Sequence, residues 1–402
     1  MNIKKGIIRR WHLLADPVVR FIASKWHRDK EIIVYGGALD LFIDNEKYIF
    51  IYNNLKHPEY KHIWLTRNSD TFERVKSLGF QVVKSNTIKG IQLILKAGTV
   101  VFDNRIDEFS YHNLSTGALR IEIWHGLPLK YFAPITNEDD DYYQLKGKLY
   151  EKYKKPNWWG EYCISTSSIF DRFVSIAFKI PKERIIRGTY PRVSILLKSE
   201  EERMAFIDSY ETESLKQLYF TIEKDSRRKI IYMPTFRDAD RDYISKAIPD
   251  WERLNQVLAK NSVVLYLKVH RVAVLPDNMN YSNIVLMDNS MDVYPLLPLF
   301  DMLITDYSSI QYDFSLMPEK KTVIYAYDID EYRGHSRGIF KFFFKLMEEL
   351  TVATTFEELL HIVASDYTQI CRFPIERFYE MPDNNEALIG FINEYYNRWI
   401  NN

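Results

Sequence analysis

Short apolar runs alternate with amphipathic stretches along the first half of the chain. Each apolar run has the length of a strand in a buried sheet. These runs are Glu31–Tyr35, Tyr48–Tyr52, His62–Leu65, Gln81–Val83, Thr99–Phe102 and Arg120–Trp124. Helical periodicity lies between several of them, as in Ser69–Leu78 and Ile88–Lys96. This alternation predicts a parallel sheet with helices on its faces.

The same pattern starts again after Pro191. Helices such as Trp251–Leu258 separate a second set of expected strands, namely Lys229–Met233, Val263–Val269, Ile284–Leu286, Met302–Thr305 and Thr322–Tyr325. The sequence therefore predicts an α/β protein of two doubly wound, Rossmann-like domains. Such domains bind ligands at the carboxyl ends of their strands, so we expect the two domains to face a common cleft.

The expected division of the chain follows from these two sets. The first α/β domain covers 31–195 and the second covers 196–375, with a hinge near Tyr190–Lys198. The last part, 376–402, contains an aromatic-rich helix, Asn385–Ile400, that we expect to pack across both domains.

Composition adds limits on the partners. The chain has 402 residues, 46% of them hydrophobic and 27% charged, which is typical of a globular enzyme. The formal net charge is +0, so global electrostatics give no reason to expect nucleic acid as a partner. Cys163 and Cys371 supply neither a disulfide framework nor metal-ligand spacing, and they suit a reducing cytoplasm.

The first 30 residues form a basic amphipathic segment with two tryptophans, Trp11 and Trp26. It has neither a run long enough to span a bilayer nor a secretory signal. We expect it to lie on an anionic leaflet, with a kink at Pro17. The alternative is a surface helix that packs on its own domain. A second basic and aromatic patch, Lys146–Trp159, either joins the same surface or forms a solvated loop and helix.

The turn after the expected strand Met302–Thr305 is the first candidate site. Ser308 and Ser309 follow it as a start signal for a helix. Free backbone N–H groups and the helix dipole at such a point favour an anion. The alternative is that the two serines only cap the helix.

Other chemistry-bearing residues also come at expected strand ends. His125 follows one strand and could accept a proton near neutral pH. Arg237 follows another and could clamp an oxyanion, or else pair with Asp238 or Asp240. Lys268 and His270 alternate so that both point to one face, which suits a phosphate. Together these groups predict a cleft for a diphosphate, where positioning and charge neutralisation do most of the catalytic work.

The ordered motifs resemble one family. They are Trp124–Lys130, Tyr190–Arg192, Pro234–Asp238, Lys268–His270, Leu303–Ser309, Tyr327–Arg333 and Arg337–Gly338. Over residues 30 to 365 the chain resembles the CDP-glycerol glycerophosphotransferase family, the teichoic acid primases and polymerases with related capsule polymerases. The resemblance implies a GT-B fold. It also implies transfer of glycerol phosphate from CDP-glycerol to a hydroxyl of a lipid-linked saccharide or a growing polyol-phosphate chain, with release of CMP. Such an enzyme would act as a peripheral protein at the cytoplasmic face of the cell membrane.

The resemblance also implies roles for residues. The 31–195 domain would bind the acceptor and the 196–375 domain the CDP-alditol. His125 would be the general base, and His270 would stabilise the diphosphate or protonate the CMP side, although exchanged roles stay open. The implied substrate-binding residues are Trp124, Gly126, Lys130, Arg192, Pro234, Thr235, Arg237, Lys268, Thr305, Ser308, Ser309, Asp313 and Arg337. We expect no cofactor and no obligatory metal site, since Asp139–Asp141 reads as a solvated loop away from the phosphate motifs.

Several alternatives stay open at this stage. The donor could be CDP-ribitol, or the chain could be a nucleotide-sugar GT-B glycosyltransferase of capsule or lipooligosaccharide assembly. A third possibility is a nucleotide-binding membrane scaffold. The presence of His125, His270 and the serine pair in one chain argues against it, because a scaffold needs none of them. The Pro-Gly turn that often follows Gly338 in the family is missing, which limits any carry-over beyond that point. No pattern in the sequence indicates the acceptor, the number of units transferred or the oligomeric state.

Overall fold

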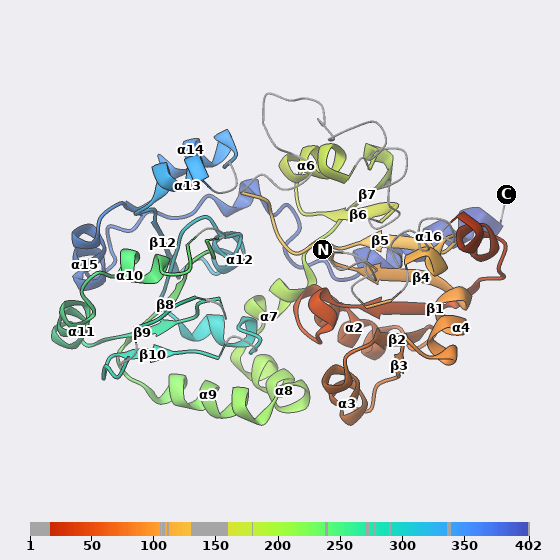
Figure 1. Ribbon diagram of the computed structural model, residues 1–402, viewed down its shortest axis with the longest axis horizontal. Coiled ribbons are helices and arrows are strands. Elements are labelled where there is room, and N and C mark those ends of the chain that lie inside the picture. The colour runs from red at the N-terminus through yellow and green to blue at the C-terminus, as the bar shows by residue number, and fades with distance from the viewer. Residues whose placement is uncertain are drawn as a thin grey trace, which may run out of the picture. The chain divides into compact units, whose positions relative to one another are not determined.

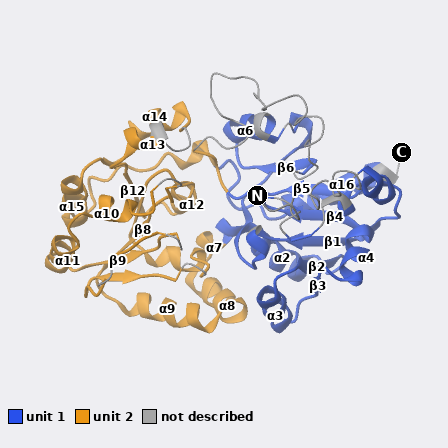
Figure 2. Cartoon of the chain, in the orientation of Figure 1, with its two compact units in different colours: residues 1–125, 144–194, 379–402 blue, residues 126–143, 195–378 orange. Residues whose placement is uncertain are grey.

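The computed structural model describes residues 17–104, 106, 109–110, 112–129, 160–178, 180–237, 240–270, 273–276, 279–288, 291–335 and 339–400. The chain divides into two compact units (Figure 2). Unit 1 comprises 1–125, 144–194 and 379–402, and unit 2 comprises 126–143 and 195–378. The expected division differs from this one at several points. Among the described residues, 126–129 fall in unit 2, whereas 17–30 and 379–400 fall in unit 1.

Unit 1 is built on a seven-stranded sheet in the order β3-β2-β1-β4-β5-β6-β7, with every neighbouring pair parallel. Its strands are β1 (Asp29–Gly36), β2 (Lys61–Thr66), β3 (Val82–Lys84), β4 (Ala97–Phe102), β5 (Leu119–Glu122), β6 (Tyr162–Ser165) and β7 (Ile185–Arg187). The labelled helices are α2 (Asp44–Lys56), α3 (Ser69–Ser77), α4 (Ile88–Lys96), α6 (Ser168–Phe178) and α16 (Ala387–Ile400), as Figure 1 shows. Short 3-10 turns are η1 (Ala38–Asp40), η3 (His112–Ser115), η4 (Lys182–Arg184) and η5 (Pro191–Val193).

Unit 2 is built on a six-stranded parallel sheet in the order β10-β9-β8-β11-β12-β13. Its strands are β8 (Arg228–Met233), β9 (Val263–Leu267), β10 (Ile284–Leu286), β11 (Met302–Thr305), β12 (Lys321–Tyr325) and β13 (Val352–Ala353). After α7 (Ser194–Leu197), the helices are α8 (Glu200–Tyr210), α9 (Glu213–Lys224), α10 (Tyr243–Ala247), α11 (Trp251–Lys260), α12 (Ile310–Phe314), α13 (Ile329–His335), α14 (Lys341–Met347) and α15 (Phe356–Ala364). The 3-10 turns are η6 (Tyr294–Leu299) and η7 (Ile375–Arg377).

The expected fold class is confirmed: both sheets are parallel and carry helices between their strands. The strand Met302–Thr305 and the helix Ile88–Lys96 have the predicted bounds. The sequence reading missed β6, β7 and β13, which are short runs of two to four residues. Runs of that length carry too little periodicity to be recognised alone.

One predicted strand is wrong. Tyr48–Tyr52 lies inside helix α2, of which Asn45 through Ile51 are all buried. Because α2 is covered around most of its circumference, its apolar residues are consecutive rather than spaced at helical intervals. A continuous apolar run does not distinguish a buried strand from a buried helix.

The carboxyl-terminal helix α16 lies in unit 1. The prediction that it packs across both domains gains no support here, since the contacts described for it fall within unit 1. It packs beside β7, and the ring of Phe391 lies 4.8 Å from that of Tyr162 on β6. Among the residues described, no helix is both long and apolar enough to cross a membrane.

The described part of the amino-terminal segment is helical over residues 17–24. Arg28 ties the end of this segment to unit 1. Its guanidinium donates to the main-chain oxygens of Ala23, Ile94 and Leu114 at 3.1, 2.6 and 3.0 Å. Burial lowers the pKa of Arg28 to about 10. Arg28, one of the cations of the expected membrane-contact segment, is therefore a structural residue of unit 1.

Candidate active site

Four predicted motifs of unit 2 follow neighbouring parallel strands. Residues 234–237 follow β8, 268–270 follow β9, 306–309 follow β11 and 326–328 follow β12. Thr305 is in register with Met233, and its hydroxyl donates to the main-chain oxygen of Met233 at 2.7 Å. Because the strands are parallel, these loops come together at one edge of the sheet, as the sequence predicted.

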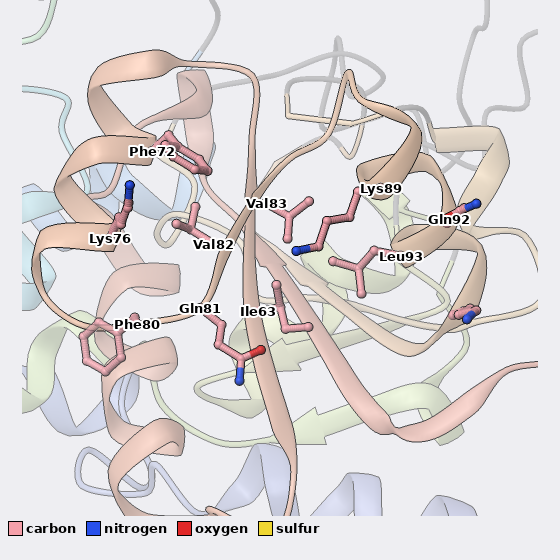
Figure 3. Close-up of a pocket in the computed structure, with 11 residues that line it drawn as sticks. Ile63, Phe72, Lys76, Phe80, Gln81, Val82, Val83, Lys89, Gln92 and Leu93 are labelled. Atoms are coloured by element: carbon pink, nitrogen blue, oxygen red, sulfur yellow. The ribbon is translucent and has the colours of Figure 1, made fainter.

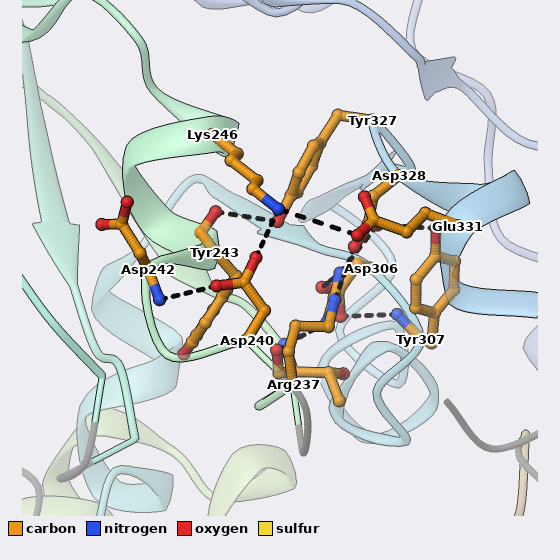
Figure 4. A network of polar contacts seen from close by, with 11 residues as sticks. Arg237, Asp240, Asp242, Tyr243, Lys246, Asp306, Tyr307, Tyr327, Asp328 and Glu331 are labelled. Carbon is orange, nitrogen blue, oxygen red and sulfur yellow. Dashed lines mark hydrogen bonds and ion pairs between the residues drawn. The ribbon is translucent and has the colours of Figure 1, made fainter. Parts of the chain in front are cut away.

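Arg237 joins three of these loops (Figure 4). Its Nη2 donates to Asp306 Oδ2 at 2.9 Å and to Asp328 Oδ1 at 2.9 Å, and its Nε donates to Asp328 Oδ2 at 2.6 Å. Its Nη1 donates to the main-chain oxygen of Thr235 at 2.6 Å. The side chain is 4% exposed. Arg237 is thus neither a surface residue nor a partner of Asp240, whose carboxylate pairs with Lys246 instead.

Four tyrosine rings enclose the same guanidinium. The rings of Tyr243, Tyr307, Tyr327 and Tyr332 have their centres 5.6, 5.2, 5.8 and 4.7 Å from the Arg237 carbon Cζ. Burial by itself lowers the pKa of Arg237, but Asp306 and Asp328 raise it above its ordinary value. Arg237 is therefore a permanent cation that fixes the loops. Its predicted direct contact with substrate stays a prediction.

Asp306 also organises the turn before α12. Its Oδ1 accepts the backbone N–H of Thr235 at 2.8 Å and of Tyr307 at 2.6 Å. The Thr235 hydroxyl oxygen is buried and has no partner among the residues described. Pro234, beside it, is buried. An unpartnered hydroxyl at this edge is suited to donate to a ligand oxygen.

The two serines start a helix, as predicted, but the expected cap is not made. Helix α12 begins at Ile310 and has five residues, and the side chain of Ser309 makes no capping hydrogen bond. The nearest contact is from the Ile310 N–H to Ser308 Oγ at 3.5 Å, which is long for a hydrogen bond. Both serines are half-buried.

The remaining predicted residues of unit 2 occupy distinct environments. Lys268 Nζ donates to the main-chain oxygens of Asp288 and Met291 at 3.1 and 3.3 Å, and burial lowers the pKa of Lys268. His270 is exposed, with its ring 4.6 Å from that of Phe236. Asp313 is 1% exposed, and its Oδ2 accepts the hydroxyl of Tyr294 at 2.6 Å. Asp313 therefore anchors α12 to η6.

The predicted base of unit 1 follows β5. Trp124 is buried with a left-handed φ of 54°, and Gly126 has a φ of 138°, so the chain turns sharply on both sides of His125. His125 is exposed, and its Nδ1 lies 3.2 Å from the main-chain oxygen of Asp103. A carbonyl oxygen only accepts, so Nδ1 carries the proton. In the neutral ring, Nε2 is then a proton acceptor, as a general base requires.

Arg192 does not present its guanidinium at a surface. It is 3% exposed, and its Nη1 pairs with Asp44 Oδ1 at 2.6 Å. Its backbone N–H donates to Asn45 Oδ1 at 3.1 Å. The sequence predicted that Arg192 lies at a hinge, but the tertiary structure buries it in unit 1, where Asp44 neutralises its charge. Its role in substrate binding stays a prediction.

Lys130 and Arg337 lie outside the residues described, as do the patch 146–159 and residues 1–16. Over the part of the chain that is described, no three His, Cys, Asp or Glu side chains gather closely enough to hold a metal ion. The expected absence of a metal and of a cofactor stays a prediction.

A pocket of about 460 Å³ lies over β2 and β3 between α3 and α4 (Figure 3). Apolar side chains, among them Ile63 and Leu93, and the cations Lys76, Lys89 and Lys96 line it. A second pocket, of about 570 Å³, lies at the amino-terminal ends of β8 and β12. Neither pocket contains a predicted site residue.

Sequence reasoning did not single out Asp306, Asp328 or the first turn of α2 as parts of the site. Asp306 and Asp328 stood within the motifs, but Arg237 meets Asp328 across 91 positions of sequence. In the sequence, Asp44, Asn45 and Glu46 form an ordinary polar helix start. In the structure Asn45 and Glu46 are buried and Asp44 is half-buried, which distinguishes them from a solvated turn.

A family model described as CDP-glycerol:poly(glycerophosphate) glycerophosphotransferase matches residues 20–387. A teichoic acid poly(glycerol phosphate) polymerase of Bacillus spizizenii is 28% identical over 357 residues, which cover 84% of this chain and 84% of that protein. The polymerase of the same name from Staphylococcus epidermidis is 28% identical over 327 residues, covering 79% of this chain. This chain spans only 42% of the length of the Staphylococcus epidermidis protein.

The structure is similar to that of the wall teichoic acid polymerase TagF. The TM-score is 0.72 at 23% sequence identity, over 98% of this chain and 95% of the other. At that identity the likeness concerns the fold, and it confirms the predicted GT-B type.

Proposed function

Because the chain belongs to the CDP-glycerol:poly(glycerophosphate) glycerophosphotransferase family, we propose that it transfers glycerol phosphate from CDP-glycerol to a hydroxyl group. The acceptor would be a lipid-linked saccharide or a growing polyol-phosphate chain, in teichoic acid or capsule synthesis. Glycerophosphate polymerases and transferases among the relatives support this activity.

The reaction would need one base and several hydrogen-bond donors. His125 Nε2 takes the proton of the acceptor hydroxyl, and the oxygen of that hydroxyl attacks the phosphorus that bears glycerol. The bond from that phosphorus to the bridging oxygen breaks, and CMP leaves with the bridging oxygen. The observation that carries this assignment is the hydrogen bond from His125 Nδ1 to Asp103, because it leaves Nε2 as the acceptor.

Unit 2 would supply the donors for the diphosphate. Thr235, Ser308 and Ser309 offer hydroxyls at the same edge of the sheet. Lys268 adds a cation just beyond β9, and His270 is exposed in the same loop. Fixed donors of this kind stabilise charge that develops on phosphate oxygens. The Arg237 cluster would keep the loops in place.

The proposed place of action is the cytoplasmic face of the cell membrane, where the protein would bind as a peripheral enzyme. Residues 17–26 offer support, because Val18, Phe21, Ile22 and Trp26 are between 43% and 66% exposed. Apolar side chains so exposed on one short segment suit the headgroup region of a bilayer.

Mass spectrometry of the reaction products tests the function. The protein is given a lipid-linked disaccharide with CDP-glycerol, with CDP-ribitol or with a nucleotide sugar. We expect CMP and an acceptor heavier by one or more glycerol phosphate units. An increase in acceptor mass with CDP-ribitol but not with CDP-glycerol would favour a ribitolphosphotransferase. Consumption of a nucleotide sugar would favour a glycosyltransferase. His125→Ala and His270→Ala should each lower kcat by about 100-fold or more, and full turnover by both variants would refute the mechanism.

A further inference from the structure

The first turn of α2 lies directly against the turn that carries His125. Asn45 is 0% exposed, and its Nδ2 donates to the main-chain oxygen of Trp124 at 2.7 Å. Its Oδ1 accepts the backbone N–H of Arg192. Asn45 therefore fixes the main chain immediately before His125 with one polar atom and is itself fixed at Arg192 with the other. An amide is needed for this, because one partner accepts and the other donates.

Asp103 supplies the contact of the ring itself. Its main-chain oxygen is the acceptor for His125 Nδ1–H. The position of the His125 main chain relative to Asp103 thus decides which ring nitrogen carries the proton. If that main chain moved, Nδ1 would lose its acceptor and Nε2 could carry the proton, and the ring could then not act as a base at Nε2.

We propose that Asn45 positions the imidazole of His125 by holding the main chain at Trp124. This inference rests on the proposed function, in which His125 is the base. Asn45 is a positioning residue, because the contacts described for it go to main-chain atoms and not to the ring. If Asn45 only completed the packing of α2, its loss would lower the stability of unit 1 without any effect on the ring.

The test combines ring spectroscopy with kinetics. Asn45→Ala and Asn45→Leu both remove the two contacts of the amide, and Asn45→Leu keeps the approximate size of the side chain. Asn54→Ala is the matched control: it lies on the same helix, and its Nδ2 bonds the local main-chain oxygen of Phe50 at 2.8 Å. Histidine-labelled protein gives the tautomer of each ring by proton–nitrogen spectra, with His125→Gln identifying the signal.

We expect a pure Nδ1–H tautomer of His125 in the wild type and in Asn54→Ala. Asn45→Ala and Asn45→Leu should give a mixture of tautomers. They should also lower kcat by about 10- to 100-fold, as misplacement of a reacting group does, with KM for CDP-glycerol nearly unchanged. Should Asn45→Leu fail to fold, Asn45→Ala alone decides.

An unchanged ring signal in folded Asn45→Ala and Asn45→Leu would overturn the inference, whatever happens to their stability. The spectra do not depend on turnover. A wild type that consumes no CDP-alditol would therefore refute the proposed function and leave the positioning measurable by itself.

Discussion

Arg237 and Asp306 form an ion pair inside unit 2, with Nη2 and Oδ2 2.9 Å apart and the two side chains 4% and 0% exposed. Arg237 follows β8 and Asp306 follows β11, so the pair fastens two neighbouring strand ends. Asp328 binds the other side of the guanidinium and brings in the loop after β12. The edge where the serine pair lies is therefore held by charge as well as by the sheet.

Replacing Arg237 by alanine should strongly destabilise unit 2. The change leaves the buried carboxylate of Asp306 without its cation, and breaking such a pair from one side costs about 3–5 kcal/mol. Urea unfolding followed by tryptophan fluorescence measures the loss. Arg253→Ala, which removes an ion pair to Glu357 at the surface, is the control and should leave the unfolding midpoint unchanged. Equal midpoints for Arg237→Ala and the wild type would mean that the cluster does not hold the loops.

His62 should make unit 1 sensitive to acid. Its Nδ1 meets the hydroxyl of Tyr35 at 3.0 Å and its Nε2 meets the main-chain oxygen of His57 at 2.9 Å. Burial lowers the pKa of His62, so the unfolded chain takes up a proton at higher pH than the folded one. This contribution to stability is complete above the unfolded pKa of about 6.5 and is lost as the pH falls from there through the folded pKa.

The measurement is the urea midpoint at about pH 7.5 and about pH 5.5, on either side of that unfolded pKa. Between these two pH values, the urea midpoint of His62→Gln should fall by less than the urea midpoint of the wild type. His361→Gln removes an exposed histidine of α15 and should follow the wild type. The same decrease for wild type and His62→Gln would exclude His62 as the cause.

The two cysteines should differ in reactivity. Cys163 is buried on β6, and burial raises the pKa of Cys163 well above its usual range, whereas Cys371 is exposed. Only a thiolate within reach of solvent reacts with iodoacetamide. Intact-mass measurement should show one alkylation per native chain, none in native Cys371→Ser and two in unfolded wild type. Alkylation of native Cys371→Ser would show that unit 1 opens at β6.

Surface binding should depend on the exposed side chains of the helix at 17–24. Phe21 and Ile22 are 66% and 51% exposed, and each could bury an apolar area worth about 1.5–3 kcal/mol in a bilayer. The double change Phe21→Ser with Ile22→Ser should weaken cosedimentation with anionic vesicles at least about tenfold. Point changes are preferable to deletion of residues 1–30, because deletion also removes the structural Arg28.

Val274→Ser provides the control for this measurement, since Val274 is 50% exposed and belongs to unit 2. It should bind vesicles as the wild type does. If both variants cosediment equally with the wild type, the amino-terminal helix is not the membrane contact.

Local pattern was sufficient where one property of a short segment decides its structure. Met302–Thr305 is a continuous apolar run between polar turns, and it is a strand with those bounds. The serines after it start a helix at Ile310. Local pattern failed for Tyr48–Tyr52, because a continuous apolar run is equally typical of a fully buried strand and of a fully buried helix.

The sequence by itself determined the fold class, the parallel sheets that bring motifs to one edge, and the family to which those motifs belong. Only the tertiary structure decided which charges meet. Arg237 pairs with Asp306 and Asp328 and not with the nearby Asp240, and Arg192 pairs with Asp44, because a buried charge that is left unpaired is costly. Hydrophobic periodicity is a local property of the sequence, whereas the partner of a buried charge depends on loops that only folding brings together.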